Sequence, residues 1–214
     1  MAGFNHKAIV VFCGTLLALT GLFAVAETRQ AQCIDCHVDS VDPAIKRLAR
    51  TVHGNLPGDD NASCISCHGT SEAHMQAPVK ISPDVSFGPN WPSGPELRSA
   101  SCLSCHEERS HVLWTGSAHQ QENLACDNCH NAHEPKDLAL DAREAEQLCL
   151  SCHPRVRAEM NLPSRHPISE GKTACSDCHN PHGGLGESGL HQLSVNDNCL
   201  SCHQEKRGPF LWEH

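Results

Sequence analysis

The chain has 214 residues, and its composition excludes an ordinary globular domain built around aliphatic and aromatic side chains. It contains 15 Cys and 17 His, but only five Phe, three Trp and no Tyr. The formal net charge of −9, without a run of basic residues, argues against nucleic-acid binding. A group other than the polypeptide is therefore expected to supply apolar volume to the interior.

The first 26 residues have the pattern of a secretory signal peptide. A short polar segment with Lys7 precedes an apolar run over 8–22, and Ala24-Val25-Ala26 places small residues at both cleavage-determining positions. The run is short for a membrane span of about 20 residues, which favours cleavage before Glu27 over a membrane anchor. The mature chain 27–214 has no second apolar stretch of spanning length and is expected to be soluble in an exported compartment, most simply a periplasm.

Cys13 lies within the leader and is lost with it, and the other 14 cysteines form seven Cys-x-x-Cys-His motifs with none left over. This is the attachment signature of c-type haem: two thiols about one helical turn apart form thioethers with the vinyl groups on one haem edge. The adjacent His gives its imidazole nitrogen to the iron as the proximal ligand. Seven haems c are therefore predicted, at Cys33, Cys36 and His37; Cys64, Cys67 and His68; Cys102, Cys105 and His106; Cys126, Cys129 and His130; Cys149, Cys152 and His153; Cys175, Cys178 and His179; and Cys199, Cys202 and His203.

Three other interpretations of Cys-x-x-Cys explain the sequence less well. A redox dithiol uses a single such motif in a strand–helix–strand setting. A structural zinc site and an exported disulfide scaffold need no His directly after every second Cys. The presence of that His in all seven motifs, behind a signal peptide, favours haem attachment.

The motifs form a repeat. Their first cysteines are 31, 38, 24, 23, 26 and 24 residues apart, so the spacing is nearly regular from Cys102 onward. The motifs that open at Cys102, Cys149 and Cys199 read Cys-Leu-Ser-Cys-His, whereas those at Cys126 and Cys175 continue as Cys-x-x-Cys-His-Asn-x-His. The repeating unit is therefore a haem pair, 47 to 50 residues long.

Each complete pair carries two histidines beyond its motifs, and these are candidates for the second axial position of the irons. His119 and His166 each follow the first cysteine of a pair by 17 residues, and a further His ends each longer motif. The predicted distal ligands, as many as the motifs, are His53, His74, His119, His133, His166, His182 and His214. His111 and His191 fall outside this register and are treated as spare.

Ligation by two histidines closes both axial positions of an iron and thereby favours electron transfer over substrate binding. Only Met75 and Met160 are available in the mature chain as methionine ligands, for two haems at most. His133 and His182 lie three residues after their motif histidines, on the same side of their own haem, so each is expected to ligate a neighbouring haem. Such iron–His bonds would crosslink a chain of about 27 mature residues per haem.

Between the motifs we expect short helices and much irregular coil, with little or no β-sheet and with the haems forming the core. Helices are predicted over 42–50, where Pro43 suits a first helical turn, and over 138–160, which is rich in Ala, Glu, Gln and Leu. Five prolines indicate a linker or an extended wrap over 77–98. The expected organisation is a signal peptide at 1–26, a first haem pair at 27–76, the linker at 77–98 and a regular five-haem array at 99–214, continuous with the first pair in an elongated wire.

Five strings of the array match a known family. They are Gly116 to His119, Ala125 to His133, His166-Pro167, Gly171 to Gly183, and Cys199 to His203 followed by Glu205 to His214. With these strings the array resembles the MtrA/DmsE/PioA family of periplasmic decahaem cytochromes c over nearly the whole mature chain. The resemblance implies bis-histidine haems in an elongated wire. It also implies that the wire carries electrons between periplasmic or inner-membrane donors and the outer surface, inserted in an outer-membrane β-barrel porin.

Family members carry about three more haem motifs after the segment that ends here at His214, and the internal repeat also stops there, halfway through a pair. The sequence is thus expected to be a shortened cytochrome or a fragment of a longer one. A seven-haem wire is shorter than the ten-haem wires of the family. Its length therefore decides whether it crosses an outer membrane and meets an extracellular partner.

The leading functional prediction is a periplasmic electron conduit without catalytic activity, which takes electrons from a quinol-linked donor and delivers them to a porin–cytochrome complex or to a terminal reductase, as redox protein partners. A multihaem reductase of nitrite, hydroxylamine or a sulfur oxyanion needs an open or Lys-ligated haem, and no Cys-x-x-Cys-Lys motif occurs. A third alternative is a subunit of a cytochrome filament, in which His214, His111 or His191 would ligate a haem of the next subunit.

Overall fold

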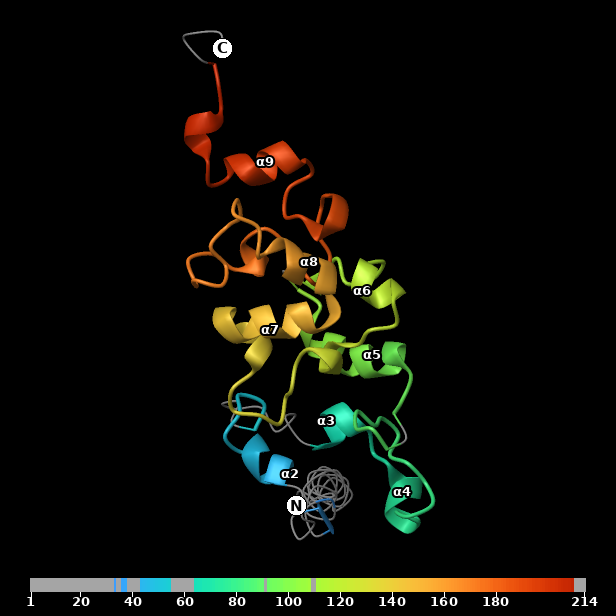
Figure 1. Cartoon of the computed structure of the whole chain (residues 1–214). Coiled ribbons are helices and arrows are strands. Elements are labelled where there is room, and N and C mark those ends of the chain that lie inside the picture. Colours follow the sequence, from blue (N-terminus) through green and yellow to red (C-terminus); the bar gives the residue numbers. More distant parts are fainter. Residues whose placement is uncertain are drawn as a thin grey trace, which may run out of the picture. The chain divides into compact units, whose positions relative to one another are not determined.

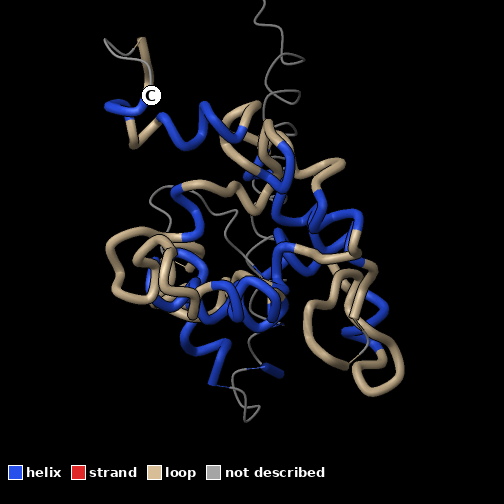
Figure 2. The backbone as a smooth tube through the Cα atoms, turned by 45° about the horizontal axis from the view of Figure 1, so that its top comes forward, coloured by secondary structure: helices blue, strands red, loops and turns tan. Residues whose placement is uncertain are grey.

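The computed structural model of the chain describes residues 33, 36–37, 43–54, 64–90, 92–108 and 111–209. The predicted signal peptide, with Cys13, and the candidate ligand His214 lie outside the described residues. Within the described ranges, short helices are joined by turns and irregular coil, and no β-strand forms apart from an isolated bridge between His179 and Leu190 (Figure 2). The predicted fold class, mainly α-helical with much irregular coil, is confirmed.

The chain divides into two compact units, Met1–Asp84 and Val85–His214. The boundary between them falls inside the proline-rich segment 77–98. The described part of the first unit contains α2 (Pro43–Leu48), α3 (Cys64–His68) and α4 (Glu72–Gln76) (Figure 1). That of the second contains α5 (Pro95–His106), α6 (Ala118–Gln121), η2 (Cys126–Asn128), η3 (Leu138–Leu140), α7 (Ala142–Cys152), α8 (Pro154–Glu159), η4 (Cys175–Asp177), η5 (Glu187–Gly189), α9 (Val195–Leu200) and η6 (Gln204–Lys206).

Prolines and capping side chains mark the starts of several helices. Helices α2, α5 and α8 begin at Pro43, Pro95 and Pro154, in the first turn, where the N–H that proline lacks has no partner within the helix. The side chain of Asp141 caps α7 by accepting two backbone N–H groups of its first turn, at 3.1 and 3.3 Å. The helix expected near residues 42–50 thus begins where its proline indicates.

The helical stretch expected over 138–160 is divided into η3, α7 and α8. The break between the two α-helices lies at His153, whose φ of −109° and ψ of 66° are not helical. Pro154 explains the break, because its ring disfavours a helical backbone in the residue before it. The break places the end of α7 at the second cysteine of a haem motif.

Few apolar side chains are buried. Among the described residues the buried hydrophobic side chains are those of Val85, Trp114, Ala125 and Leu150, and no large side chain is completely enclosed. Other apolar side chains remain at the surface, such as Leu140 with 79% exposure. The described polypeptide therefore has little hydrophobic core of its own, as its composition predicts.

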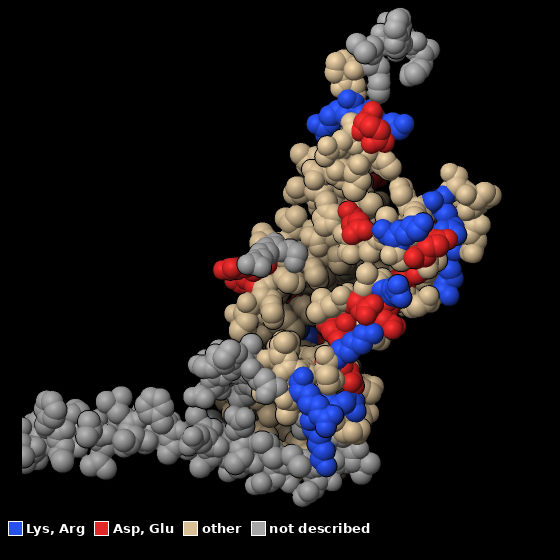
Figure 3. All heavy atoms as spheres, turned by 90° about the vertical axis from the view of Figure 1, so that its left-hand side faces the viewer, with Lys and Arg blue, Asp and Glu red and all other residues tan. Residues whose placement is uncertain are grey.

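Charged side chains of both signs adjoin at the surface, as one face of the molecule shows (Figure 3). In the second unit Lys136 lies 3.2 Å from Asp141, and Arg165 lies 2.7 Å from Glu170. The hydrogen bond from the Arg165 guanidinium lowers the pKa of Glu170 to about 2. Exposed pairs of this kind contribute little to stability.

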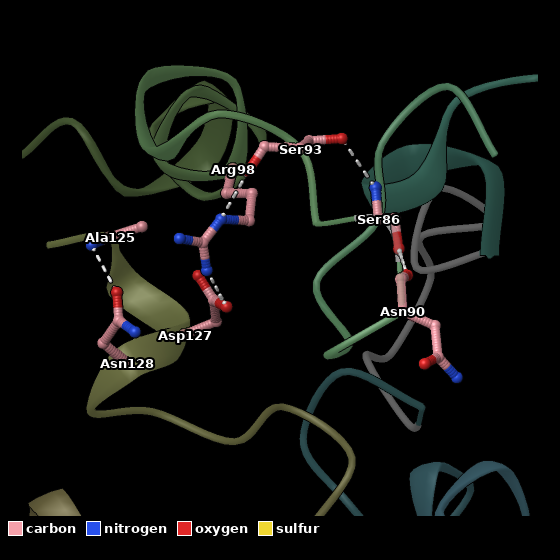
Figure 4. A network of polar contacts seen from close by, with 7 residues as sticks. All are labelled: Ser86, Asn90, Ser93, Arg98, Ala125, Asp127 and Asn128. Atoms are coloured by element: carbon pink, nitrogen blue, oxygen red, sulfur yellow. Dashed lines mark hydrogen bonds and ion pairs between the residues drawn. The ribbon is translucent and has the colours of Figure 1, made fainter. Parts of the chain in front are cut away.

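A less exposed ion pair joins α5 to η2 in the second unit (Figure 4). The Nη1 of Arg98 donates to Oδ2 of Asp127, and its Nε donates to the carbonyl oxygen of Ser93 at 3.0 Å. The side chains of Arg98 and Asp127 are 11% and 21% exposed. Because the carboxylate has lost most of its water, the guanidinium compensates for its desolvation.

We expect Arg98→Met to destabilise the second unit by about 2 kcal/mol, because it leaves the Asp127 carboxylate partly buried without its cation. The thermal midpoint, followed by far-ultraviolet circular dichroism, should fall by several degrees. Arg155→Met is the matched control, since Arg155 is 90% exposed in its pair with Glu159 and its loss should change the midpoint little. Equal shifts in the two variants would contradict the role of Arg98.

Gly183 lies where two segments of the second unit touch. A Cβ atom at this position would stand 2.3 Å from the carbonyl oxygen of Leu113, and the φ of Gly183 is +119°. Glycine alone combines this backbone conformation with so close an approach. The contact holds the loop that carries His182, the preceding residue, against the segment that begins at His111.

Gly183→Ala is expected to lower the free energy of unfolding by about 2 kcal/mol, since both the backbone conformation and the space for a methyl group are unfavourable. The midpoint of urea unfolding measures this loss. Gly88→Ala serves as the control, because a Cβ atom there meets nothing within 4 Å. If the two variants proved equally stable, the loop would not depend on this glycine.

Candidate functional site

In the described part of the chain, four motifs lie on or at the end of named α-helices, and Cys33, Cys36 and His37 of the first motif are also helical. Helices α3 and α5 end at the motif histidines His68 and His106, α7 ends at Cys152, and α9 includes Cys199. Side chains three residues apart on a helix lie on the same face. The helix ends therefore present the two thiols of a motif on one side, as attachment to one haem edge requires.

The two motifs that begin with η2 and η4 share a different geometry. The N–H of Ala125 donates to Oδ1 of Asn128 at 2.8 Å, and the N–H of Ala174 donates to Oδ2 of Asp177 at 2.8 Å. The φ angles of the two alanines are −121° and −120°. These hydrogen bonds close the turn that carries the thiols. The motif pattern does not predict them, because its two middle residues have no role in haem attachment.

In the same two motifs, the backbone of the trailing histidine is held by the same hydrogen bond. The N–H of His133 donates to Oδ1 of Asn131 at 3.1 Å, and the N–H of His182 donates to Oδ1 of Asn180 at 3.0 Å. Asparagine favours such a turn because its side chain bonds the backbone two residues on. The sequence repeat Cys-x-x-Cys-His-Asn-x-His is thus also a structural repeat.

The first cysteines of paired motifs approach each other. A hydrogen bond with the Cys102 thiol lowers the pKa of Cys126 to about 6. Cys149 and Cys175 are also hydrogen-bonded, while burial raises the pKa of both thiols. In the first unit, burial and then the neighbouring Cys64 raise the pKa of Cys33. Each predicted haem pair therefore has its two first sulfurs close together.

The second cysteines link one predicted pair to the next in the second unit. Burial raises the pKa of Cys129, and the nearby Cys152 raises it further. Burial also raises the pKa of Cys178, with smaller contributions from Asp177 and Cys202. Attachment sulfurs of consecutive motifs thus neighbour one another from Cys102 to Cys202.

Several histidines are held through Nδ1. A proton on Nδ1 leaves the lone pair of Nε2 available to a metal and fixes the orientation of the ring. The spare His191 is held the other way, because its Nε2 binds the carbonyl oxygen of Ser176 at 2.8 Å. The Nδ1 bonds are those of His74 to the carbonyl of Ile81 (2.7 Å), His119 to the carbonyl of Pro181 (2.8 Å), His130 to Oδ2 of Asp137 (2.7 Å) and His179 to the carbonyl of Ser188 (2.9 Å).

Imidazole rings of motif and predicted distal histidines lie near one another in pairs. Two imidazoles on opposite sides of one metal have centroids about 6 Å apart, because each nitrogen lies about 2 Å from the metal. The ring pairs near this separation that join a motif to a predicted distal histidine are His37 with His74 (6.2 Å) in the first unit, and His119 with His153 (6.2 Å), His166 with His203 (6.2 Å) and His130 with His182 (5.9 Å) in the second. The motif histidine His106 has a similar separation from the spare His111, 5.8 Å.

His182 lies in a crowded part of the site. Its ring centroid is 4.4 Å from that of His111 and 6.4 Å from that of Trp114. Burial, and to a smaller extent the neighbouring His111, lower the pKa of His182 to about 4, so the ring is neutral at pH 7. His111, which the repeat register left as a spare, is thus brought into the site by the fold, and the sequence carries no signal for it.

The structure also places two of the remaining predicted ligands. His53 lies half-buried in the turn after α2, and His133 lies half-buried after η2. Among the described residues, no imidazole ring faces that of His179. Within the same ranges no three His, Cys, Asp or Glu side chains converge as they would around zinc, and no helix is long and apolar enough to cross a membrane.

The residues present fit haem c. Each of four motifs combines paired thiols and an adjacent imidazole with a second imidazole at the required spacing. These are the motifs of His37, His130, His153 and His203. The exposed apolar side chains supply surface suited to contact with a porphyrin. A bare metal ion would not need the paired thiols and the imidazole in this order.

Comparisons with known proteins agree with this chemistry. Residues 118–158 and 166–208 each match the family described as doubled CXXCH motif, and residues 19–69 match the family of cytochrome c554 and c-prime. The chain is 38% identical over 186 residues to the multiheme cytochrome MtrA of Shewanella baltica (strain OS185), which covers 85% of this chain. It spans 55% of the length of that relative. The chain belongs to the MtrA-type family of multihaem c-type cytochromes and carries haem c.

Proposed function

We propose that the chain is a seven-haem electron conduit without catalytic activity, in which each motif holds one haem c through its two cysteines. The observation that carries the proposal is the spacing of four imidazole pairs, 5.9 to 6.2 Å, close to that of two axial ligands on one metal. When bound, haem c supplies an iron that changes its oxidation state by one electron. Two imidazoles per iron leave no axial position for a substrate.

The ring pairs support a distal ligand for each of four motifs. The Nδ1 hydrogen bonds of His74 and His119 orient these rings so that Nε2 is left for the iron. His53, His133 and His214 are proposed for the remaining irons. The four assignments are His74 for the motif of His37, His182 for that of His130, His119 for that of His153 and His166 for that of His203.

In the second unit each of these ligands passes over at least one motif: His119 and His166 pass over one, and His182 passes over two. His119 precedes the motif at Cys126 but pairs with His153, and His182 follows the motif at Cys175 but pairs back with His130. The arrangement supports the expectation that His182 does not ligate its own haem. Ligands that skip a motif crosslink successive repeats, so that iron–His bonds stabilise the array as a whole.

Conduction requires neighbouring haems at short range, because electron transfer falls steeply with distance. The hydrogen bonds between Cys102 and Cys126 and between Cys149 and Cys175 support such a spacing within pairs. The neighbouring second cysteines support it between pairs. Electrons would then pass from motif to motif along the second unit.

The compartment and partners are part of the same proposal. The leader supports export to a periplasm, and the identity to MtrA supports a role among redox protein partners. We expect a quinol-linked donor cytochrome on one side. On the other side we expect an outer-membrane β-barrel porin, with which the cytochrome would associate at the outer membrane, or a terminal reductase.

A haem count combined with electron paramagnetic resonance tests the proposal. The intact mass of the purified holoprotein should exceed that of the mature polypeptide by seven haems. The oxidised protein should show only low-spin ferric signals, because every iron has two axial ligands. Fewer haems would refute the count. A high-spin ferric signal would indicate an open iron, assigned first to the motif of His179, and would call for assays with nitrite, hydroxylamine and sulfur oxyanions.

Replacing single distal histidines tests the assignments. His119→Ala and His166→Ala should each convert one haem in seven from low to high spin, because each removes one axial ligand. His191→Ala is the control and should leave all haems low-spin, since its Nε2 is bound to the Ser176 carbonyl. A wholly low-spin His119→Ala protein would mean that another residue ligates the haem of His153.

A further inference from the structure

We infer that Asp137 tunes the haem bound at Cys126 and Cys129 to a lower reduction potential than that of the structurally matched haem at Cys175 and Cys178. The inference rests on the proposed function, because it requires haem at both motifs. Asp137 acts through His130, the proximal ligand of the first of these haems. It is therefore a positioning and tuning residue that need not touch the haem itself.

The hydrogen bond between His130 and Asp137 is short and partly shielded from water. Nδ1 of His130 donates to Oδ2 of Asp137 at 2.7 Å, and the two side chains are 32% and 19% exposed. A carboxylate acceptor draws the Nδ1 proton more strongly than a neutral acceptor and makes the bond charge-assisted. Low exposure preserves the effect, because little water screens the charge.

The carboxylate is held in place by the start of η3. Its other oxygen, Oδ1, accepts the N–H of Ala139 at 3.0 Å, and the Asp137 carbonyl accepts the N–H of Leu140 at 3.1 Å. Lys136, the adjacent cation, is directed to Asp141 and Glu144 at 3.2 and 3.4 Å. The position of Asp137 is thus fixed by the helix start, and its neighbouring lysine does not neutralise it.

The motif with η4 provides an internal comparison. His179 also donates from Nδ1, but to the carbonyl oxygen of Ser188 at 2.9 Å, which is a neutral acceptor. Ser188 has a φ of 56°, in the left-handed region, within the short loop that follows this motif. The two motifs share the alanine hydrogen bond, the 3-10 turn and the trailing Asn-x-His. Within these segments the acceptor of the Nδ1 proton is what differs between the proximal histidines, and the ring of His182 faces His130 in addition.

The sign of the effect follows from ligand basicity. A carboxylate on Nδ1 gives the imidazole partial imidazolate character and raises the basicity of Nε2. A more basic ligand stabilises the ferric state over the ferrous state, which lowers the potential. Within the array this haem would take up its electron after the matched haem, although the two differ little in local backbone.

The test compares Asp137→Asn with Asp177→Asn in the holoprotein. Both remove one negative charge beside a haem motif, but only the first removes the charge from a proximal His–acceptor bond. Asn already stands at position 128, equivalent to Asp177, so the control keeps the alanine hydrogen bond. The readouts are the haem count, a spectroelectrochemical titration and the low-spin electron paramagnetic resonance signals.

In Asp137→Asn we expect one of seven one-electron steps to move to a higher potential. A tenfold change in its equilibrium constant corresponds to about 59 mV. The low-spin signal of one haem should change with it. Asp177→Asn should move no step by as much, and Asp137→Glu should restore part of the low potential. An unmoved titration in Asp137→Asn, or equal shifts in the two Asn variants, would overturn the inference.

Two further outcomes separate this inference from the proposed function. A wild-type protein without haem at Cys126 or Cys175 would refute the proposed function at that motif, and this inference with it. A full haem count with unchanged potentials would refute the inference alone. If Asp137→Asn fails to fold, Asp137→Ser replaces it, because Ser also caps helix starts while removing the carboxylate.

Discussion

Coordination of paired imidazoles is the constraint on which the rest of the proposed structure depends. The described polypeptide buries very few apolar side chains, so contacts between its short helices hold little of it together. Metal–ligand bonds differ from such contacts because they are strong and specific, and they form between residues far apart in the sequence. His119 and His153, for example, are 34 residues apart, and their bonds to one iron would close a loop that contains a complete motif.

The proposed ligand pattern, in which each ligand passes over a motif, has a consequence for cooperativity. If each haem were ligated within its own motif, every repeat would form a separate unit with few contacts to the next. A ligand that passes over a motif would join one repeat to the next, so the loss of one haem would weaken the placement of its neighbour. The hydrogen bond from His119 to the carbonyl of Pro181, 62 residues away in the same chain, also connects two repeats, without a metal.

The two motifs with 3-10 turns show how a repeat diversifies without changing its backbone. Asn128 and Asp177 perform the same structural task on the preceding alanine. The loops that follow then present different acceptors, Asp137 and Ser188, to equivalent histidines. Differences in potential along a chain of similar haems can thus arise from loop residues, while the attachment chemistry stays constant.

The sequence by itself determined the attachment chemistry, the alternation of motif types and the helical, strand-poor fold class. These depend on residues within about one turn of each other, where spacing alone decides geometry. Only the tertiary structure decided which imidazole rings lie about 6 Å apart, that Asp137 is hydrogen-bonded to His130, and that the His111 ring lies against that of His182. Those contacts join loops of irregular length. Pro154 and Gly183 also turn the chain at points that the spacing of the haem motifs does not predict. The pairing of imidazole rings tens of residues apart depends on how these turns orient successive repeats. The spacing of motifs along the sequence does not contain that orientation.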